Sequence, residues 1–243
     1  MFGLIISDPA CDISRRSALT SLLHDLDLPL AAFTESEAPI FSPDMPRADF
    51  LRRASYALLM PGQPLPMEAL LTHLSALDPL PANVLRRYLF LQWSLQPYLL
   101  VHHEVTWMKD CFLLGSDLLI VPVSPDDTVD TLLPPGVWTE LTGQTHTGRL
   151  RCMRGYNELP ILARENALIP ISINGQSLTL TTQDDADRIT LHWYQPGASA
   201  QCTLADGTRY HVQRIGEHIN IHADTDRPFH LIMHQDGVET LVR

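Results

Sequence analysis

Residues 112–171 constrain the fold most, because short apolar runs alternate there with turn signals. The first run, residues 112–123, is apolar and ends in β-branched residues, which is typical of a strand buried on both faces. The second run, residues 132–143, contains a Pro-Gly pair that predicts a hinge between two short strands. The third, residues 159–171, predicts two more strands about a polar turn. Four or five strands at this spacing predict an antiparallel β-sandwich.

Composition and charge exclude several classes of function. The chain has 243 residues, of which 45 % are hydrophobic and 19 % charged, enough for one large or two small cores. A formal net charge of −11 without clustered basic residues argues against binding to nucleic acid or an anionic membrane. Residues 1–6 lack the basic start of a signal peptide, and no apolar stretch approaches the roughly 20 residues of a membrane span. We therefore expect a cytoplasmic protein.

Cysteine and histidine spacing does not favour a metal centre. The four cysteines are far apart and form no CxxC pair: Cys11, Cys111, Cys152 and Cys202. Reduced, packed thiols are therefore expected rather than disulfides or a zinc site. Adjacent His102 and His103 cannot converge from one regular element, and the pairs at 218/222 and 230/234 are too far apart along a strand to share an ion. The nucleotide, dinucleotide, serine hydrolase and zinc protease motifs are missing as well, so we expect no cofactor and no metal.

The residues before this stretch follow a different pattern. Apolar runs at 2–7 and 28–33 alternate with amphipathic segments at 13–26 and 47–60, which is typical of βα units with parallel strands. A longer helix is expected over 84–100, where Pro97 should kink or end it.

The residues after this stretch form a second β region. Alternation predicts strands at 178–182, 188–194, 200–204, 218–222 and 229–233, separated by Gly-containing turns. The fold class expected is thus α/β followed by all-β, with divisions at 1–108, 109–173 and 174–243.

Ordered matches over the central stretch resemble the β-sandwich that follows the catalytic barrel in family 31 glycoside hydrolases, the α-glucosidase and α-xylosidase family. The family's patterns F-x-L-G-x-x-L-L-V-x-P-V, L-P-x-G-x-W, T-G and P-I/V-x-x-R-x-x-x-I-I-P are matched by Phe112, Leu114, Gly115, Leu118, Leu119, Pro122, Val123, Leu133, Pro135, Gly136, Trp138, Thr142, Gly143, Pro160, Arg164, Ile169 and Pro170. The helix motif with Pro97-Tyr98 and the distal motif from Tyr194 to Gly216 extend the likeness. The resemblance implies a remnant of the last βα units of a (β/α)₈ barrel at 1–108, a proximal β-sandwich at 109–173 and a small distal β-domain at 174–243.

The catalytic residues that this resemblance calls for are incompletely represented. Retaining glycosidases use two carboxyl groups about 5–5.5 Å apart. The family's nucleophile motif, similar to D-G-x-W-x-D-x-N-E, finds no match, and the acid/base position falls where only Asp8 and Asp12 are candidates, with ordinary loop or cap aspartates as the alternative. Glu35 is the candidate in place of the family's sugar-binding aspartate, and 64–66 read Pro-Leu-Pro where the family has Arg-x-His. A truncated, degenerate relative that is not active alone is therefore expected.

Aromatic side chains are the remaining hint of sugar binding. Five of them could stack on pyranose rings or pack in the core: Trp138, Tyr156, Trp193, Tyr194 and Tyr210. Trp193 and Tyr194 are kept as candidate substrate-binding residues.

Three hypotheses on function follow. In the first, the chain is an inactive relative of a glycosidase that serves as partner or regulator or is a gene remnant. In the second, it is a carbohydrate-binding or scaffold module. In the third, a companion chain completes an active enzyme. Because a few βα units cannot close an eight-stranded barrel, we also expect self-association or a companion chain to cover open strand edges.

Overall fold

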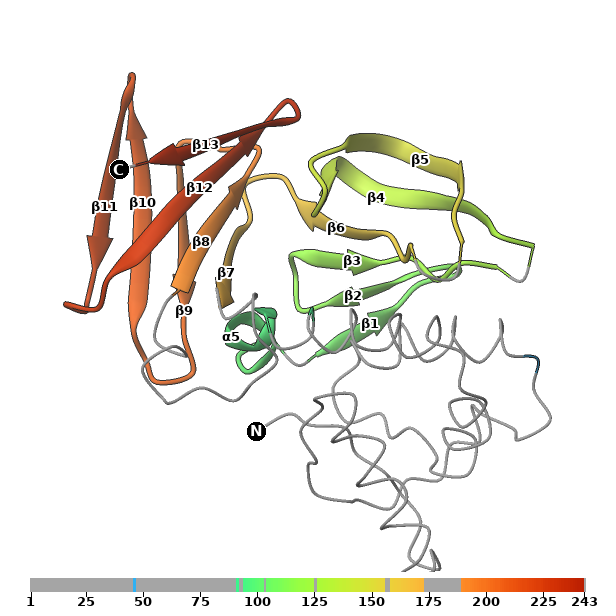
Figure 1. The fold of residues 1–243 in the computed structure, drawn as a ribbon, viewed down its shortest axis with the longest axis horizontal. Coiled ribbons are helices and arrows are strands. Elements are labelled where there is room, and N and C mark those ends of the chain that lie inside the picture. Colours follow the sequence, from blue (N-terminus) through green and yellow to red (C-terminus); the bar gives the residue numbers. More distant parts are fainter. Residues whose placement is uncertain are drawn as a thin grey trace, which may run out of the picture. The chain divides into compact units, whose positions relative to one another are not determined.

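The computed structural model (Figure 1) describes residues 46, 91, 94–102, 104–124, 126–155, 158–172 and 189–242. These residues hold one short helix and thirteen strands in three sheets. The expected βα units before residue 91 and the strand at 178–182 lie outside the described residues, so the barrel remnant stays a prediction. No helix within the ranges given above has the length and apolar character needed to span a bilayer.

The described helix, α5 (Gln96–Leu99), is joined to the sheet that follows it. Pro97 lies in the first turn of α5. Leu95, two residues before it, is a turn residue that interrupts the helix, in agreement with the break expected at this proline. The hydroxyl of Tyr98 donates a hydrogen bond to the Leu114 carbonyl oxygen over 2.8 Å and accepts one from the Asp117 N–H over 3.2 Å. The helix is thereby fixed to the hairpin over residues 112–120.

A six-stranded sheet follows in the order β1-β2-β3-β6-β4-β5. Its strands are β1 (Val105–Trp107), β2 (Phe112–Leu114), β3 (Leu118–Ile120), β4 (Thr128–Glu140), β5 (Thr145–Met153) and β6 (Ile161–Arg164). The pairs β1–β2, β2–β3, β3–β6 and β6–β4 are antiparallel, as the sequence predicted.

Two strand boundaries in this sheet differ from prediction. The single strand expected over 112–123 is a hairpin of β2 and β3, because Gly115 turns the chain with a φ of 58°. The two short strands expected over 132–143 are one long strand, β4, in which Gly136 adopts a φ of 116° and bends the chain without ending the strand. The Pro-Gly pair therefore marks a bend rather than a hinge between two strands.

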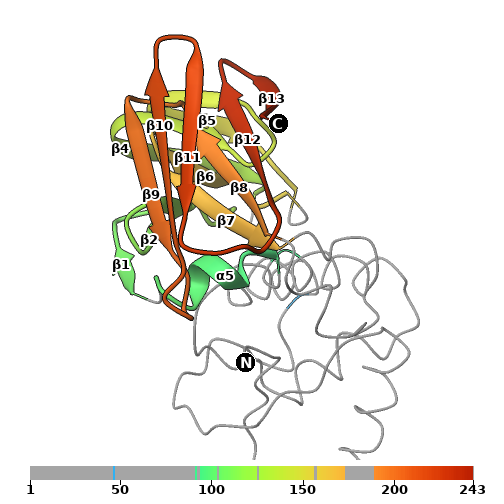
Figure 2. The same cartoon turned by 90° about the vertical axis from the view of Figure 1, so that its left-hand side faces the viewer.

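Two further sheets make up the distal part (Figure 2). A four-stranded sheet has the order β13-β12-β8-β7 and a three-stranded sheet the order β11-β10-β9. The strands are β7 (Leu168–Ser172), β8 (Ile189–Tyr194), β9 (Ser199–Thr203), β10 (Arg209–Ile215), β11 (His218–Ala223), β12 (Phe229–Gln235) and β13 (Val238–Val242). Four of these strands were predicted within a residue or two, whereas β10 and β13 were not predicted.

The chain changes from one sheet to the next between β6 and β7. β6 pairs in the six-stranded sheet, but β7 pairs with β8 in the four-stranded sheet, where Leu168 lies opposite Trp193. β8 and β12 are parallel, which the local sequence pattern did not indicate.

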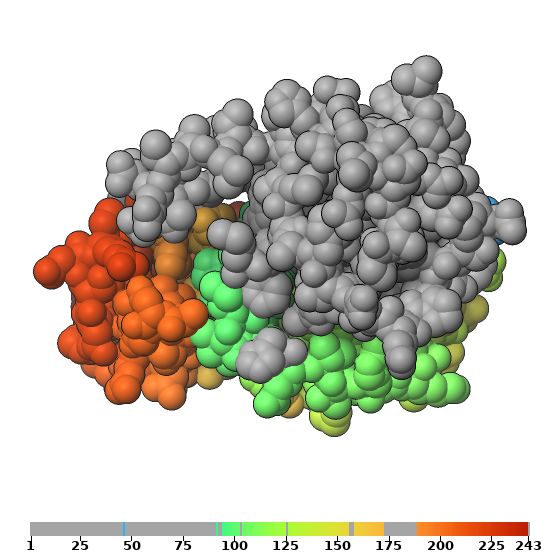
Figure 3. All heavy atoms as spheres, turned by 90° about the horizontal axis from the view of Figure 1, so that it is seen from below, coloured from blue at the N-terminus to red at the C-terminus, as the bar shows by residue number. Residues whose placement is uncertain are grey.

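The distal sheets share one apolar core. Its buried members come from both sheets and their connections: Leu168, Ile189, Leu191, Trp193, Cys202, Leu204, Tyr210, Val212 and Leu231. In the space-filling view the distal residues, in orange, lie beside residues in green, which belong to the part of the chain that holds α5 and β1–β3 (Figure 3). All three sheets belong to one compact unit.

Candidate functional site

The candidate residues for sugar chemistry fall into two groups. Asp8, Asp12 and Glu35 lie outside the described residues, so their roles stay predictions. Trp193 and Tyr194 are described, and their side chains are 0 % and 1 % exposed.

Trp193 and Tyr194 pack in the core, so they do not offer a ring face to a sugar. The indole N–H of Trp193 donates to Asn166 Oδ1 over 3.0 Å, and the Tyr194 ring stacks on His234 with centroids 4.3 Å apart. Trp138 and Tyr210 are equally buried, and Tyr156 lies outside the described residues. Core packing, the alternative that the sequence left open for these aromatics, is what the structure shows for all four described rings.

The described cysteines are free thiols. Cys111 and Cys202 are buried and Cys152 is partly exposed. Burial raises the pKa of the Cys202 thiol to about 12 and also raises that of Cys111, so both are poor nucleophiles near neutral pH. Among the described residues, no three His, Cys, Asp or Glu side chains come together as a metal site.

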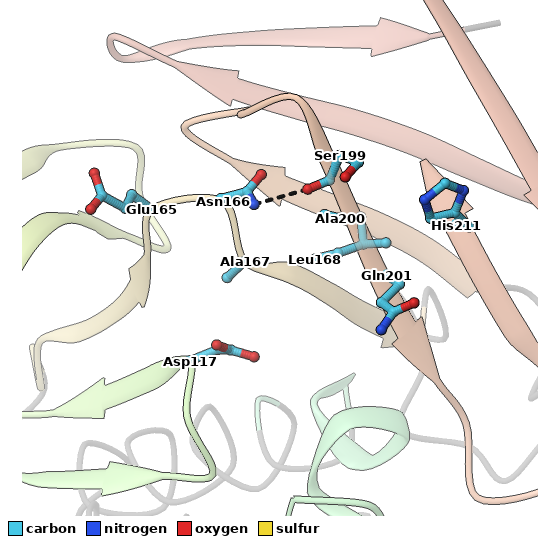
Figure 4. A pocket seen from close by; sticks show the side chains of 9 residues that line it. All are labelled: Asp117, Glu165, Asn166, Ala167, Leu168, Ser199, Ala200, Gln201 and His211. Atoms are coloured by element: carbon cyan, nitrogen blue, oxygen red, sulfur yellow. Dashed lines mark hydrogen bonds between the residues drawn. The ribbon is translucent and has the colours of Figure 1, made fainter. Parts of the chain in front are cut away.

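A polar pocket of about 530 Å³ lies where the β2–β3 and β6–β7 turns meet strands β9 and β10 (Figure 4). Its lining is Asp117, Glu165, Asn166, Ala167, Leu168, Ser199, Ala200, Gln201 and His211. We call it the Asp117 pocket.

Asn166 fixes one wall of the Asp117 pocket. It has a φ of 62°, and its side-chain amide donates to the Ser199 carbonyl oxygen over 2.9 Å. Its Oδ1 accepts hydrogen bonds from the Trp193 indole and, over 2.9 Å, from the Gly197 N–H. One exposed turn residue thus joins the β6–β7 turn to the loop between β8 and β9.

The side chains that line the Asp117 pocket are mainly hydrogen-bonding groups. In Figure 4, Asp117 and Gln201 point toward the space below Ala167 and Leu168, whereas Glu165 points away from it. No Trp, Tyr or Phe ring and no Lys or Arg side chain is among the described lining residues, and His211 supplies the one ring. The lining therefore favours hydrogen bonding to a polar ligand over stacking on a large aromatic face.

A second pocket, of about 330 Å³, lies between the β1–β2 turn and strands β4 and β5. It is lined by Met108, Lys109, Asp110, Cys111, Asp130, Thr131, Leu132 and Arg149. Arg149 donates from Nε and Nη2 to the two carboxylate oxygens of Asp130, over 2.5 and 2.8 Å. This bidentate pair with Arg149 keeps the pKa of Asp130 below its usual value.

Trp107 stands directly before this second pocket and was not among the aromatics selected from sequence. Its side chain is 61 % exposed, and its ring packs against Phe112 with centroids 5.0 Å apart. Among the described Trp, Tyr and Phe residues it is the only exposed one. The sequence signal that it offered was a tryptophan in a short run that is followed, after Met108, by the charged residues Lys109 and Asp110.

Comparison with known proteins gives one family match. Residues 86–169 match the glycosyl hydrolase family 31 C-terminal domain. No curated protein sequence matches the chain.

Solved structures resemble the chain in fold. A cycloalternan-forming enzyme from Listeria monocytogenes, in complex with a pentasaccharide substrate, has a TM-score of 0.65 at 16 % identity, covering 79 % of this chain and 23 % of its own. A Flavobacterium johnsoniae family 31 dextranase complexed with glucose has a TM-score of 0.60 at 16 % identity, covering 80 % and 30 %. A family 31 α-xylosidase from Xanthomonas citri has a TM-score of 0.58 at 15 % identity, covering 78 % and 26 %. The chain spans less than a third of the length of each of these proteins.

Proposed function

We propose, on the premise that residues 86–169 form a glycosyl hydrolase family 31 C-terminal domain, that this chain is a family 31-like protein of carbohydrate metabolism that does not hydrolyse glycosidic bonds by itself. One observation carries the proposal: the match lies on the C-terminal domain, while the printed sequence has no segment like the family's nucleophile motif. Double displacement at a sugar needs a nucleophile as well as an acid/base group, so Asp8 or Asp12 alone cannot sustain it.

Hydrolysis of aryl α-glucosides and α-xylosides by the purified chain tests this directly. The proposal predicts no phenol release above the uncatalysed rate, in the wild type and in the Asp8→Asn/Asp12→Asn double variant alike. Release by the wild type that disappears in the double variant would show that these carboxylates belong to a working site.

Saccharide binding without cleavage is the second candidate function. Two observations favour it: the described part contains two pockets lined by hydrogen-bonding side chains, and an exposed tryptophan, Trp107, directly precedes Met108 of the smaller pocket's lining in the chain. Two of the similar structures hold saccharides, a pentasaccharide substrate and glucose, which makes an α-linked glucose oligomer the first ligand to test. We expect saturable binding of maltotriose or isomaltotriose in a calorimetric titration. If both sugars give only the heat of dilution, saccharide binding is excluded as a function.

A companion chain is the third candidate. If the residues before α5 supply only some strands of a barrel, the outermost strands have unpaired backbone N–H and C=O groups. A second copy of the chain or another protein would then have to pair with or cover these strands. Light scattering of the purified chain checks the first option: a monomer at high concentration would count against self-association.

A further inference from the structure

Trp107 is an exposed ring held in place by a buried one. It is the last residue of the edge strand β1, directly opposite Phe112 of β2, whose side chain is fully buried. Their ring centroids are 5.0 Å apart at an interplanar angle of 48°. The contact with Phe112 anchors the indole and leaves 61 % of the side chain open to solvent. Tryptophan is enriched at binding surfaces, where part of the ring packs on apolar groups and part meets the solvent.

The turn that follows Trp107 forms one wall of the second pocket. The N–H of Met108 donates to the Cys111 carbonyl oxygen over 2.9 Å, which closes the turn and carries Lys109 and Asp110 across its tip. Neither Lys109 nor Asp110 has an ion-pair partner within the described ranges. Their head groups are thus available as hydrogen-bond donor and acceptor.

The opposite wall comes from β4 and β5. There Asp130 and Arg149 form the bidentate ion pair, and Leu132 adds a side chain that is 73 % exposed. The lining carries two positive charges, on Lys109 and Arg149, and two negative charges, on Asp110 and Asp130. Its net charge is therefore zero. A balanced lining selects for a neutral ligand rather than an anion or a cation.

From this we infer that Trp107 and the second pocket form a binding site for a neutral, α-linked glucose oligosaccharide. A neutral sugar meets all three properties of the site: its apolar ring face stacks on the indole and on Leu132, its hydroxyl groups bond to Lys109 and Asp110, and it carries no charge. The pocket volume of about 330 Å³ lies within the roughly 300–1,000 Å³ of small-molecule sites. This inference rests on the second candidate function and names its location.

The test is titration of the full chain with maltotriose, followed by tryptophan fluorescence in the presence of acrylamide as a quencher. Trp138 and Trp193 are buried, so among the described tryptophans only Trp107 is accessible to the quencher. We expect saturable protection from quenching in the wild type. Trp107→Ala should weaken binding about tenfold, the value of one stacked aromatic ring, whereas Trp107→Phe should keep binding within a few-fold.

Val238→Ala is the matched control, because its side chain is 63 % exposed and lies in the distal strand β13. Binding should be unchanged in this variant, and circular dichroism should show all variants folded. Wild-type affinity in Trp107→Ala would overturn the location while leaving saccharide binding in place. Absence of binding to folded wild-type protein would overturn both, and a change of oligomeric state in Trp107→Ala without any sugar binding would assign the surface to a protein contact instead.

Discussion

The hydroxyl oxygen of Tyr98 lies 2.8 Å from the carbonyl oxygen of Leu114, and this hydrogen bond joins the end of α5 to the β2–β3 hairpin. Burial and the nearby charge of Asp117 raise the pKa of Tyr98 above its ordinary value, so the hydroxyl stays protonated and donates. The Pro-Tyr pair that resembles a family motif thus has a structural role in fixing the helix to the sheet.

Tyr98→Phe should lower the free energy of unfolding by about 1–3 kcal/mol, because the buried Leu114 carbonyl and the partly buried Asp117 N–H both lose a partner. Urea denaturation of the two proteins measures the difference. Tyr210→Phe is the control, since the hydroxyl of this buried tyrosine has no hydrogen-bond partner among the described residues. An equal loss in both variants would contradict the role given to Tyr98.

Gly115→Ala should destabilise the fold more than Gly207→Ala. Both glycines have positive φ, which costs an L-residue about 1–2 kcal/mol. At Gly115 an added Cβ would also lie 2.6 Å from His102 Cβ, whereas at Gly207 no atom lies within 4 Å. Thermal melts should show the lower melting temperature for Gly115→Ala. Equal melting temperatures would show that the residues around Gly115 rearrange to accept the added Cβ without loss of stability.

Stability should fall as the pH drops from 6.5 to 4, because of a histidine pair. Nδ1 of His192 lies 2.8 Å from Nε2 of His234, and burial, with a smaller contribution from His234, lowers the pKa of His192 to about 4. Burial also lowers the pKa of His234, against the effect of Glu239. The unfolded chain, with an ordinary histidine pKa near 6.5, binds the proton first, so stability is fully present above this pH and is lost below it.

The loss from His192 should reach about 3 kcal/mol, at about 1.4 kcal/mol per pKa unit. Urea denaturation at pH 7 and pH 4.5 measures it. His192→Gln should flatten the dependence, whereas His218→Gln, at an exposed position, should leave it unchanged. If His192→Gln keeps the full dependence, other groups are responsible for it.

Asn166→Ala should cost about 2–3 kcal/mol, from the lost hydrogen bonds of the Trp193 indole and the Gly197 N–H and from the strained φ of 62°. Asn166→Asp keeps the acceptor for both donors and loses only the bond to Ser199, so it should cost less. Chemical denaturation ranks the two variants. An Asp variant as unstable as the Ala variant would mean that the donation to Ser199 dominates.

The sequence predicted strands well but not their partners. Alternation placed β8, β9, β11 and β12 within a residue or two, because it reports on faces of a strand. It could not show that β7 leaves the sheet of β6, or that β8 and β12 are parallel, since pairing depends on residues far apart in the chain. β10 was missed because the alternation is short: Tyr210 and Val212 are buried between exposed residues, but residues 213–215 are all exposed and extend no pattern.

The candidate sugar-binding residues show the same limit. Leu191 and Trp193 share one face of β8 and are both buried, so the indole packs in the core although the sequence analysis kept it as a candidate sugar-binding residue. Trp107 was passed over because its exposure depends on its edge position opposite Phe112, which only the sheet reveals. Asp8, Asp12 and Glu35 were selected by resemblance alone and lie outside the described residues.

The central claim is that the chain binds an α-linked glucose oligosaccharide and does not cut it. Calorimetric titration of the purified full chain with maltotriose, with chromatography of the sugar recovered afterwards, tests both halves in one experiment. The account predicts a saturable binding heat, no continuing heat of hydrolysis and unchanged maltotriose. Steady release of glucose by the wild-type chain would contradict it.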